Sequence, residues 1–92
     1  MTDKWSRSAE LVNQRGLHAR ASAALAREAS RWNAKVTVHH DGMSASAASI
    51  MDLLMLAARV GQTIEIDAEG PQAVEALDAI CELIARKFDE KD

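Results

Sequence analysis

KVTVHHDGMSASA, residues 35–47, is the stretch of sequence that decides the fold. The two valines in residues 35–40 alternate with polar residues, and this period of two predicts a strand with one buried face. Asp41 and Gly42 follow, and both tolerate the positive φ angles that a two-residue hairpin turn requires. The chain then returns over 43–47 as the second strand of the hairpin. The sheet that contains this hairpin is therefore predicted to be antiparallel.

Two further strands are predicted outside the hairpin, at residues 5–12 and 63–70, where apolar and polar residues also alternate. Three segments with apolar or small residues at helical spacing lie between or after the strands, at 19–32, 49–60 and 71–88. The predicted order is βαββαβα. This order favours an α+β open-faced β-sandwich, in which a four-stranded antiparallel sheet is covered on one face by three helices.

The ends of the second and third helices carry sequence signals. Ser49 and Asp52 have the spacing of a capping box, so the second helix is expected to begin after Ser49. Gly61 is expected to end that helix as a residue with positive φ. Pro71 is expected at the first position of the third helix, where its missing N–H has no cost.

Composition limits the class of protein. The chain has 92 residues, enough for one domain, which is predicted to span 1–92. Its net charge of −3 and its three aromatic residues (Trp5, Trp32 and Phe88) give no basic or stacking surface for nucleic acid. Cys81 is the only cysteine, so no disulfide framework is expected. No secretion signal precedes the first strand, and the longest apolar run is too short to cross a bilayer. A cytoplasmic protein without a membrane anchor is therefore expected.

The stretch NQRGLHARAS, residues 13–22, contains the candidate functional residue His18. Gly16 allows a sharp turn, after which His18 lies at the start of a helix whose first amides have no partner within the helix. Those amides and the helix dipole favour an anion, and Arg20 adds donors that suit phosphate oxygens. The same dipole disfavours a positively charged ring and so favours a neutral, nucleophilic imidazole. The pattern is compatible with a phosphoryl group carried on His18.

Simpler interpretations of His18 remain open on the residues alone. An isolated histidine next to a glycine is commonly a surface residue or a helix cap. A metal site has little support, because His39 and His40 are adjacent on a strand and point to opposite faces, and no further ligand has suitable spacing. A catalytic triad also has little support, because no orienting carboxylate is close in sequence. The residue types alone predict a phosphoryl or anion site and nothing more specific.

Two motifs resemble those of the bacterial HPr phosphocarriers. They are G-L-H-A-R at 16–20, preceded by Asn13, and S-A-S-A-A-S-I at 44–50. The resemblance extends over essentially the whole chain. The segment from Asp52 to the C-terminal region resembles most the nitrogen-related branch of that family, called NPr. Membership implies a sheet with strand order 1-4-2-3 and all helices on one side.

The resemblance also implies a role for each matched residue. His18 corresponds to the histidine that enzyme I phosphorylates on Nδ1, with phosphoenolpyruvate as the source, and that passes the phosphoryl group to an EIIA-type protein. Arg20 corresponds to the arginine that stabilises the phosphoryl group. Ser49 corresponds to a regulatory serine, the target of HPr kinase/phosphorylase in some bacteria. The chain departs from the family at Ala21, where proline is usual, and at Ala48, where lysine is frequent.

A carrier of this family is expected to be a monomeric, stoichiometric intermediate without cofactor or metal, not an enzyme that turns over by itself. Its expected docking patch comprises five residues on the first two helices: Ala23, Arg27, Ile50, Met51 and Leu54. An alternative function is a regulatory binding module that controls a partner protein by docking and is switched by phosphorylation. A small ligand-binding domain of ferredoxin-like type is a third possibility, and it has no need of the His18-x-Arg20 motif.

Overall fold

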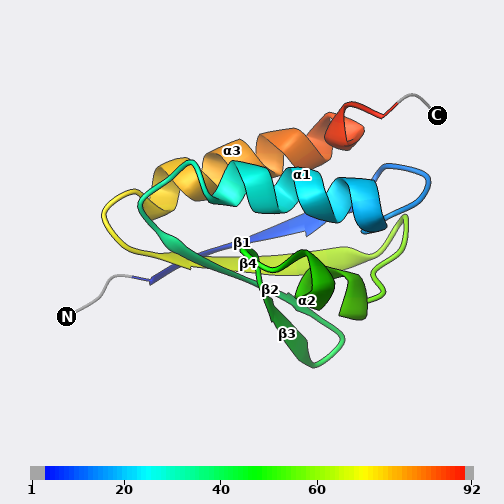
Figure 1. Cartoon of the computed structure of the whole chain (residues 1–92), viewed down its shortest axis with the longest axis horizontal. Coiled ribbons are helices and arrows are strands. Elements are labelled where there is room, and N and C mark those ends of the chain that lie inside the picture. Colours follow the sequence, from blue (N-terminus) through cyan, green and yellow to red (C-terminus); the bar gives the residue numbers. More distant parts are fainter. Residues whose placement is uncertain (1–3, 91–92) are drawn as a thin grey trace.

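The computed structural model describes residues 4–90 (Figure 1), and its elements follow the predicted βαββαβα order with one additional short turn at the end. The elements are β1 (Lys4–Glu10), α1 (Ala19–Ala29), β2 (Lys35–His40), β3 (Met43–Ser46), α2 (Ile50–Met55), β4 (Thr63–Glu69), α3 (Ala73–Ala85) and the 3₁₀ turn η1 (Lys87–Asp89). Residues 1–3 and 91–92 of the predicted 1–92 domain lie outside the described residues. Within 4–90, no helix has the length and apolar character that a membrane span requires.

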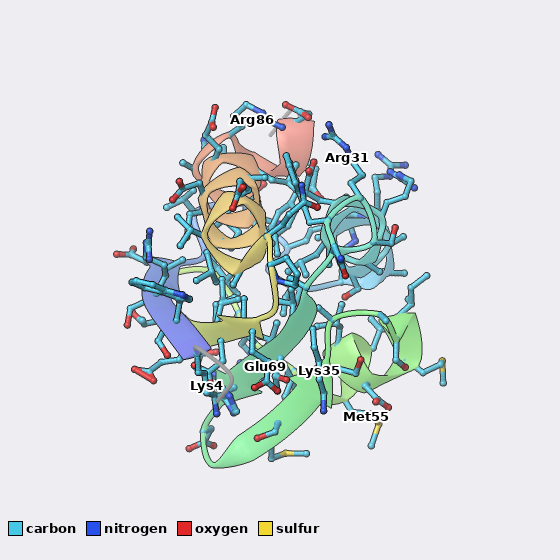
Figure 2. The ribbon with its side chains drawn as sticks, turned by 90° about the vertical axis from the view of Figure 1, so that its left-hand side faces the viewer. Lys4, Arg31, Lys35, Met55, Glu69 and Arg86 are labelled. Atoms are coloured by element: carbon cyan, nitrogen blue, oxygen red, sulfur yellow. The ribbon has the colours of Figure 1, made fainter. Side chains whose placement is uncertain are left out.

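The four strands form one antiparallel sheet with the order β1-β4-β2-β3, which confirms the predicted fold class and strand order. The hairpin turn between β2 and β3 also forms as predicted, because Asp41 and Gly42 have φ angles of 50° and 78°. The central strand β4 supplies Ile64, Ile66 and Ala68 to the core. The helices cover this apolar face of the sheet, as Figure 2 shows from the end of the molecule.

The opposite face of the sheet is polar and carries a network centred on Asp67. Ser6 donates a hydrogen bond of 2.5 Å to this carboxylate, and His39 Nε2 lies 2.7 Å from it. The hydrogen bond from Ser6 is the main reason that the pKa of Asp67 is lowered, and His39 and Lys4 lower it further against the opposing effect of burial. An open, polar face of this kind is what the alternating strands predict.

Five predicted ends of elements are wrong by one to five residues. The first helix ends at Ala29 and not at residue 32, because Ser30 follows as the C-cap and its hydroxyl donates to the Arg27 carbonyl at 2.8 Å. The second helix ends at Met55, because Ala57 already takes a left-handed conformation (φ 52°). Gly61 has the predicted positive φ (85°), but it lies beyond the end of the helix. The strands predicted at 5–12, 43–47 and 63–70 end one or two residues earlier than expected.

Both predicted ends of the third helix also differ. Helix α3 begins at Ala73, so Pro71 lies in the preceding turn and not at the first helical position. The side chain of Gln72 does not cap the helix, because its Oε1 accepts a hydrogen bond of 2.7 Å from the Asn33 amide. The helix ends at Ala85, three residues before the predicted end at Phe88.

Beyond α3 the backbone makes a left-handed turn. Lys87, Phe88 and Asp89 have φ angles of 60°, 55° and 61°, a conformation that is rare for residues other than glycine. Phe88 is only 6% exposed within this turn, and η1 contacts both α1 and α3. The turn directs Glu90 towards the N-terminus of α1, where His18 lies.

Candidate functional site at the N-terminus of α1

His18 is the N-cap residue of α1. Its backbone is extended (φ −78°, ψ −175°), and its carbonyl accepts the first helical hydrogen bond from the Ser22 amide at 2.9 Å. Its ring Nδ1 accepts a hydrogen bond from the Arg20 amide at 3.3 Å. The side chain is 24% exposed, so part of the ring is open to solvent. The cap that the sequence allowed as a simple interpretation is therefore present, and it aims Nδ1 at the free amides of the helix.

The loop before His18 is held against the segment that follows α2. Gly16 has φ +61°, and a Cβ built on it would lie 2.5 Å from the carbonyl oxygen of Ala58. That same oxygen accepts a hydrogen bond of 3.0 Å from the Leu17 amide. Only glycine meets both the backbone angle and the close approach. This contact fixes His18 beside the C-terminal end of α2.

A carboxylate contacts the other nitrogen of the His18 ring. Glu90 Oε2 lies 2.6 Å from His18 Nε2, and the Glu90 side chain is only 10% exposed. The sequence offered no carboxylate near the motif, and Glu90 is 72 residues away along the chain. The reasoning from sequence missed this residue because only the left-handed turn after α3 brings it to the site.

Asn13 joins the loop to Glu90 from a fully buried position. Its Nδ2 donates to the Gly16 carbonyl at 2.8 Å and to Glu90 Oε1 at 3.2 Å. Both partners are acceptors, which fixes the orientation of the amide group. Its Oδ1 is buried without a partner among residues 4–90.

These contacts define one tautomer of the neutral His18 ring. A carboxylate only accepts hydrogen bonds, so the contact with Glu90 requires the ring hydrogen on Nε2. A backbone amide only donates, so its bond to Nδ1 requires a lone pair on that atom. The two requirements agree, and Nδ1 is the nucleophilic nitrogen.

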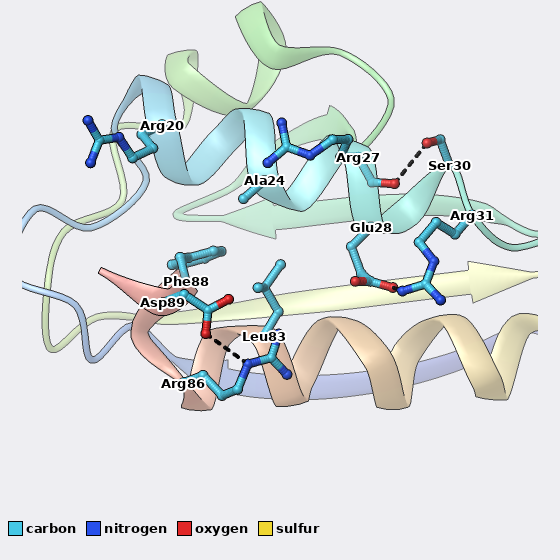
Figure 3. A pocket seen from close by; sticks show the side chains of 10 residues that line it. All are labelled: Arg20, Ala24, Arg27, Glu28, Ser30, Arg31, Leu83, Arg86, Phe88 and Asp89. Carbon is cyan, nitrogen blue, oxygen red and sulfur yellow. Dashed lines mark hydrogen bonds and ion pairs between the residues drawn. The ribbon is translucent and has the colours of Figure 1, made fainter. Parts of the chain in front are cut away.

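Arg20 and Arg27 both line an open groove of about 580 Å³ between α1 and the end of α3 (Figure 3). Two other arginines of the groove are paired with acids: Arg31 lies 2.9 Å from Glu28, and Arg86 lies 3.1 Å from Asp89. Within residues 4–90, the guanidinium groups of Arg20 and Arg27 have no such partner. Both are exposed and available to an anion or to an acidic protein surface.

The remaining predicted docking residues lie on the same side of the sheet. Ile50 and Met51 are 41% and 69% exposed, whereas Leu54 on α2 and Ala23 on α1 are half-buried. Met55, labelled in Figure 2, projects from the end of α2 and is 66% exposed. Helix α2 packs on α1, and three of these apolar side chains on α2 are exposed: Ile50, Met51 and Met55.

Ser49 caps α2 as predicted, since its hydroxyl accepts a hydrogen bond of 3.2 Å from the Asp52 amide. His39 and His40, considered above as metal ligands, lie on β2, and His39 Nδ1 contacts Ser44 at 2.7 Å. Residues 4–90 contain no group of three or more His, Cys, Asp or Glu side chains that could hold a metal ion. Burial raises the pKa of the half-buried Cys81 thiol, which keeps it protonated and unreactive.

Comparison with known proteins gives a consistent result. A family model for the phosphorylation site of the HPr component of the phosphotransferase system (PTS) matches residues 5–86. Phosphocarrier protein NPr of Shewanella violacea is 46% identical over 87 residues, which cover 95% of this chain and 96% of the relative. Phosphocarrier protein HPr of Cupriavidus necator is 42% identical over 84 residues, covering 91% and 94%. A crystal structure of HPr from Thermoanaerobacter tengcongensis superimposes with a TM-score of 0.90 at 33% identity, covering 96% of this chain and 99% of the other.

Proposed function

The chain belongs to the HPr family of PTS phosphocarrier proteins, and on that premise we propose that it accepts a phosphoryl group on Nδ1 of His18 from enzyme I and passes it to an EIIA-type protein. It acts as a single-domain, monomeric carrier in the cytoplasm, in a nitrogen-related regulatory branch. The similarity to an NPr protein supports that branch.

The observation that carries this proposal is the lone pair on Nδ1 of a partly exposed ring. This lone pair attacks the phosphorus atom of the donor. A bond from Nδ1 to phosphorus forms while the bond from phosphorus to the donor atom breaks, and its electron pair returns to the donor. Transfer to the acceptor is the same step in reverse. No proton has to leave the ring, because the ring hydrogen is on Nε2.

The helix N-terminus and Arg20 stabilise the transferred group. The Arg20 amide, which bonds to Nδ1 in the free protein, is released when Nδ1 binds phosphorus and then faces a phosphoryl oxygen. The unpaired guanidinium of Arg20, two residues after His18, supplies further donors. Both contacts act on negative charge that is absent before transfer, so they favour the phosphorylated state.

Docking uses the exposed residues around the ring. Met51 and Ile50, with the half-buried Leu54, give a partner an apolar surface. Arg27, with Ala23 beside it on α1, offers a positive charge to an acidic rim. Unbranched methionine side chains adapt to more than one surface, as a carrier that docks on a donor and then on an acceptor requires.

Ser49 offers a point of regulation. Phosphorylation by an HPr kinase/phosphorylase would leave the helix cap in place, because a helix N-terminus accepts a phosphate group. The added charge of about −2 would lie beside the apolar docking residues and would oppose an acidic partner. Phosphorylated Ser49 is therefore expected to block docking without unfolding the domain.

The test is phosphorylation by purified enzyme I and labelled phosphoenolpyruvate. Wild-type protein should gain an acid-labile label, and His18→Ala should gain none. His39→Ala is the matched control, because it removes a histidine from the open face of the sheet and should leave labelling intact. Labelling that persists in His18→Ala contradicts the proposal. Onward transfer to an EIIA protein separates a carrier from a regulatory module that is only switched by phosphorylation.

A further inference from the structure

We propose that Glu90 is a positioning residue for phosphoryl transfer, which holds the hydrogen of the His18 ring on Nε2 and compensates the positive charge of the phosphorylated ring. This inference rests on the function proposed above. It assigns a role to a residue outside the two motifs, in the segment after α3.

The first support is the geometry of the contact. The 2.6 Å separation of Glu90 Oε2 and His18 Nε2 is that of a short, charge-assisted hydrogen bond. Only 10% of the Glu90 side chain is exposed, so water competes weakly for the carboxylate. Its second oxygen is held by the buried amide of Asn13 at 3.2 Å, which fixes the plane of the carboxylate. Glu90 therefore restricts both the tautomer and the orientation of the ring.

The second support comes from the charge balance of the reaction. Attack through Nδ1 leaves a ring that carries phosphorus on Nδ1 and hydrogen on Nε2, which is a cation before any proton is lost. A carboxylate in contact with Nε2 stabilises this cation, as the aspartate of a serine-protease triad stabilises its histidine. When the phosphoryl group leaves, the electron pair of its bond returns to Nδ1 and the ring is again neutral. Glu90 neither gains nor loses a proton in this cycle.

The third support is the strained backbone that brings Glu90 to the ring. Three successive residues other than glycine, 87–89, have positive φ angles, and such a turn persists only where its surroundings hold it. The buried ring of Phe88 fixes it between α1 and α3, as Figure 3 shows. The Asp89 and Glu90 amides close it through bonds of 3.0 Å to the Arg86 and Lys87 carbonyls.

Glu90→Gln is the informative substitution because it keeps the size of the side chain and removes its charge. In the wild type, one carboxylate oxygen accepts a hydrogen bond from His18 Nε2 and the other accepts one from Asn13 Nδ2. In Glu90→Gln, one of these two oxygens is replaced by an NH₂ group. Whichever way the amide is turned, one donor faces another donor. Part of the population is then expected to carry the ring hydrogen on Nδ1, where it blocks attack.

The experiment combines two measurements on wild type, Glu90→Gln, Glu90→Asp and the matched control Asp89→Asn. The control removes one carboxylate from the same turn, but that carboxylate pairs with Arg86 and not with His18. Nitrogen-15 NMR of the ring reports the tautomer without any partner protein. Quenched-flow labelling by enzyme I reports the rate of phosphorylation.

We expect Glu90→Gln to populate the Nδ1–H tautomer and to be phosphorylated about 10- to 100-fold more slowly, by analogy with carboxylates that orient metal-bound histidines. Glu90→Asp should recover part of the rate because the charge is kept, and Asp89→Asn should match wild type in both measurements. A wild-type rate and wild-type tautomer in Glu90→Gln would overturn the inference. Failure of the wild-type protein itself to be labelled would overturn the proposed carrier function instead, and the NMR result would still report on the contact.

Discussion

Replacement of Gly16 by alanine should destabilise the protein more than the same replacement at any open turn. Alanine in the left-handed conformation that Gly16 adopts (φ +61°) costs about 1 kcal/mol. The new Cβ would also lie 2.5 Å from the Ala58 carbonyl oxygen, and this oxygen must move away. Its movement weakens the Leu17–Ala58 hydrogen bond of 3.0 Å, which contributes about 1 kcal/mol. The expected loss for Gly16→Ala is therefore about 2 kcal/mol.

Gly42→Ala provides the matched control for this prediction. Gly42 also has positive φ (+78°), but a Cβ there meets nothing within 4 Å. It should cost about 1 kcal/mol, so the difference between the two variants isolates the contact with Ala58. Urea unfolding followed by circular dichroism and analysed by linear extrapolation gives both values. Equal losses in the two variants would refute the reasoning that close packing of the loop, and not only its backbone angle, requires glycine.

Three further outcomes are expected. Ser49→Ala should lower the free energy of unfolding by about 1 kcal/mol, measured in urea, because α2 loses its cap, and Ser49→Thr should retain most of it. Phe88→Ala should cost about 3 kcal/mol and disorder the turn, and a loss below about 1 kcal/mol would show that the ring does not anchor it. The pKa of Asp67 is lowered in the folded state, mainly by the hydrogen bond from Ser6 and also by His39. The ionised carboxylate therefore adds to the free energy of unfolding above the unfolded pKa of about 4, and this stabilisation is lost as pH falls through the folded pKa. The stability difference between wild type and Asp67→Asn should accordingly shrink from pH 6 to pH 2.5, and a constant difference would contradict this assignment.

The parts of the fold that were predicted correctly depend on interactions between neighbours in sequence. The alternation in β2 and β4 and the Asp41-Gly42 turn are local features, and the structure retains all of them. The helix ends were predicted less well, because they depend on distant contacts, on local caps or on a backbone conformation that the residue type does not suggest. Gln72 illustrates this point, since its side chain binds the Asn33 amide in place of capping α3. Ala57 likewise ends α2 in a conformation that its residue type does not suggest.

The functional site also combines residues that are close in sequence with one that is distant. The two kinds of residue contact opposite nitrogens of the His18 ring. The amides and Arg20 that face Nδ1 follow His18 directly, so the sequence predicted an electropositive environment for an anion. The acceptor that faces Nε2 comes from Glu90, through a turn that no residue pattern signals. The ring therefore lies between a donor at Nδ1 and a carboxylate at Nε2. In the mechanism proposed above, negative charge arrives on the first side and positive charge remains on the second. In that mechanism, the residues next to His18 alone would hold the phosphoryl group but leave the cationic ring uncompensated. The proposed role of Glu90, 72 positions away, is to supply this compensation.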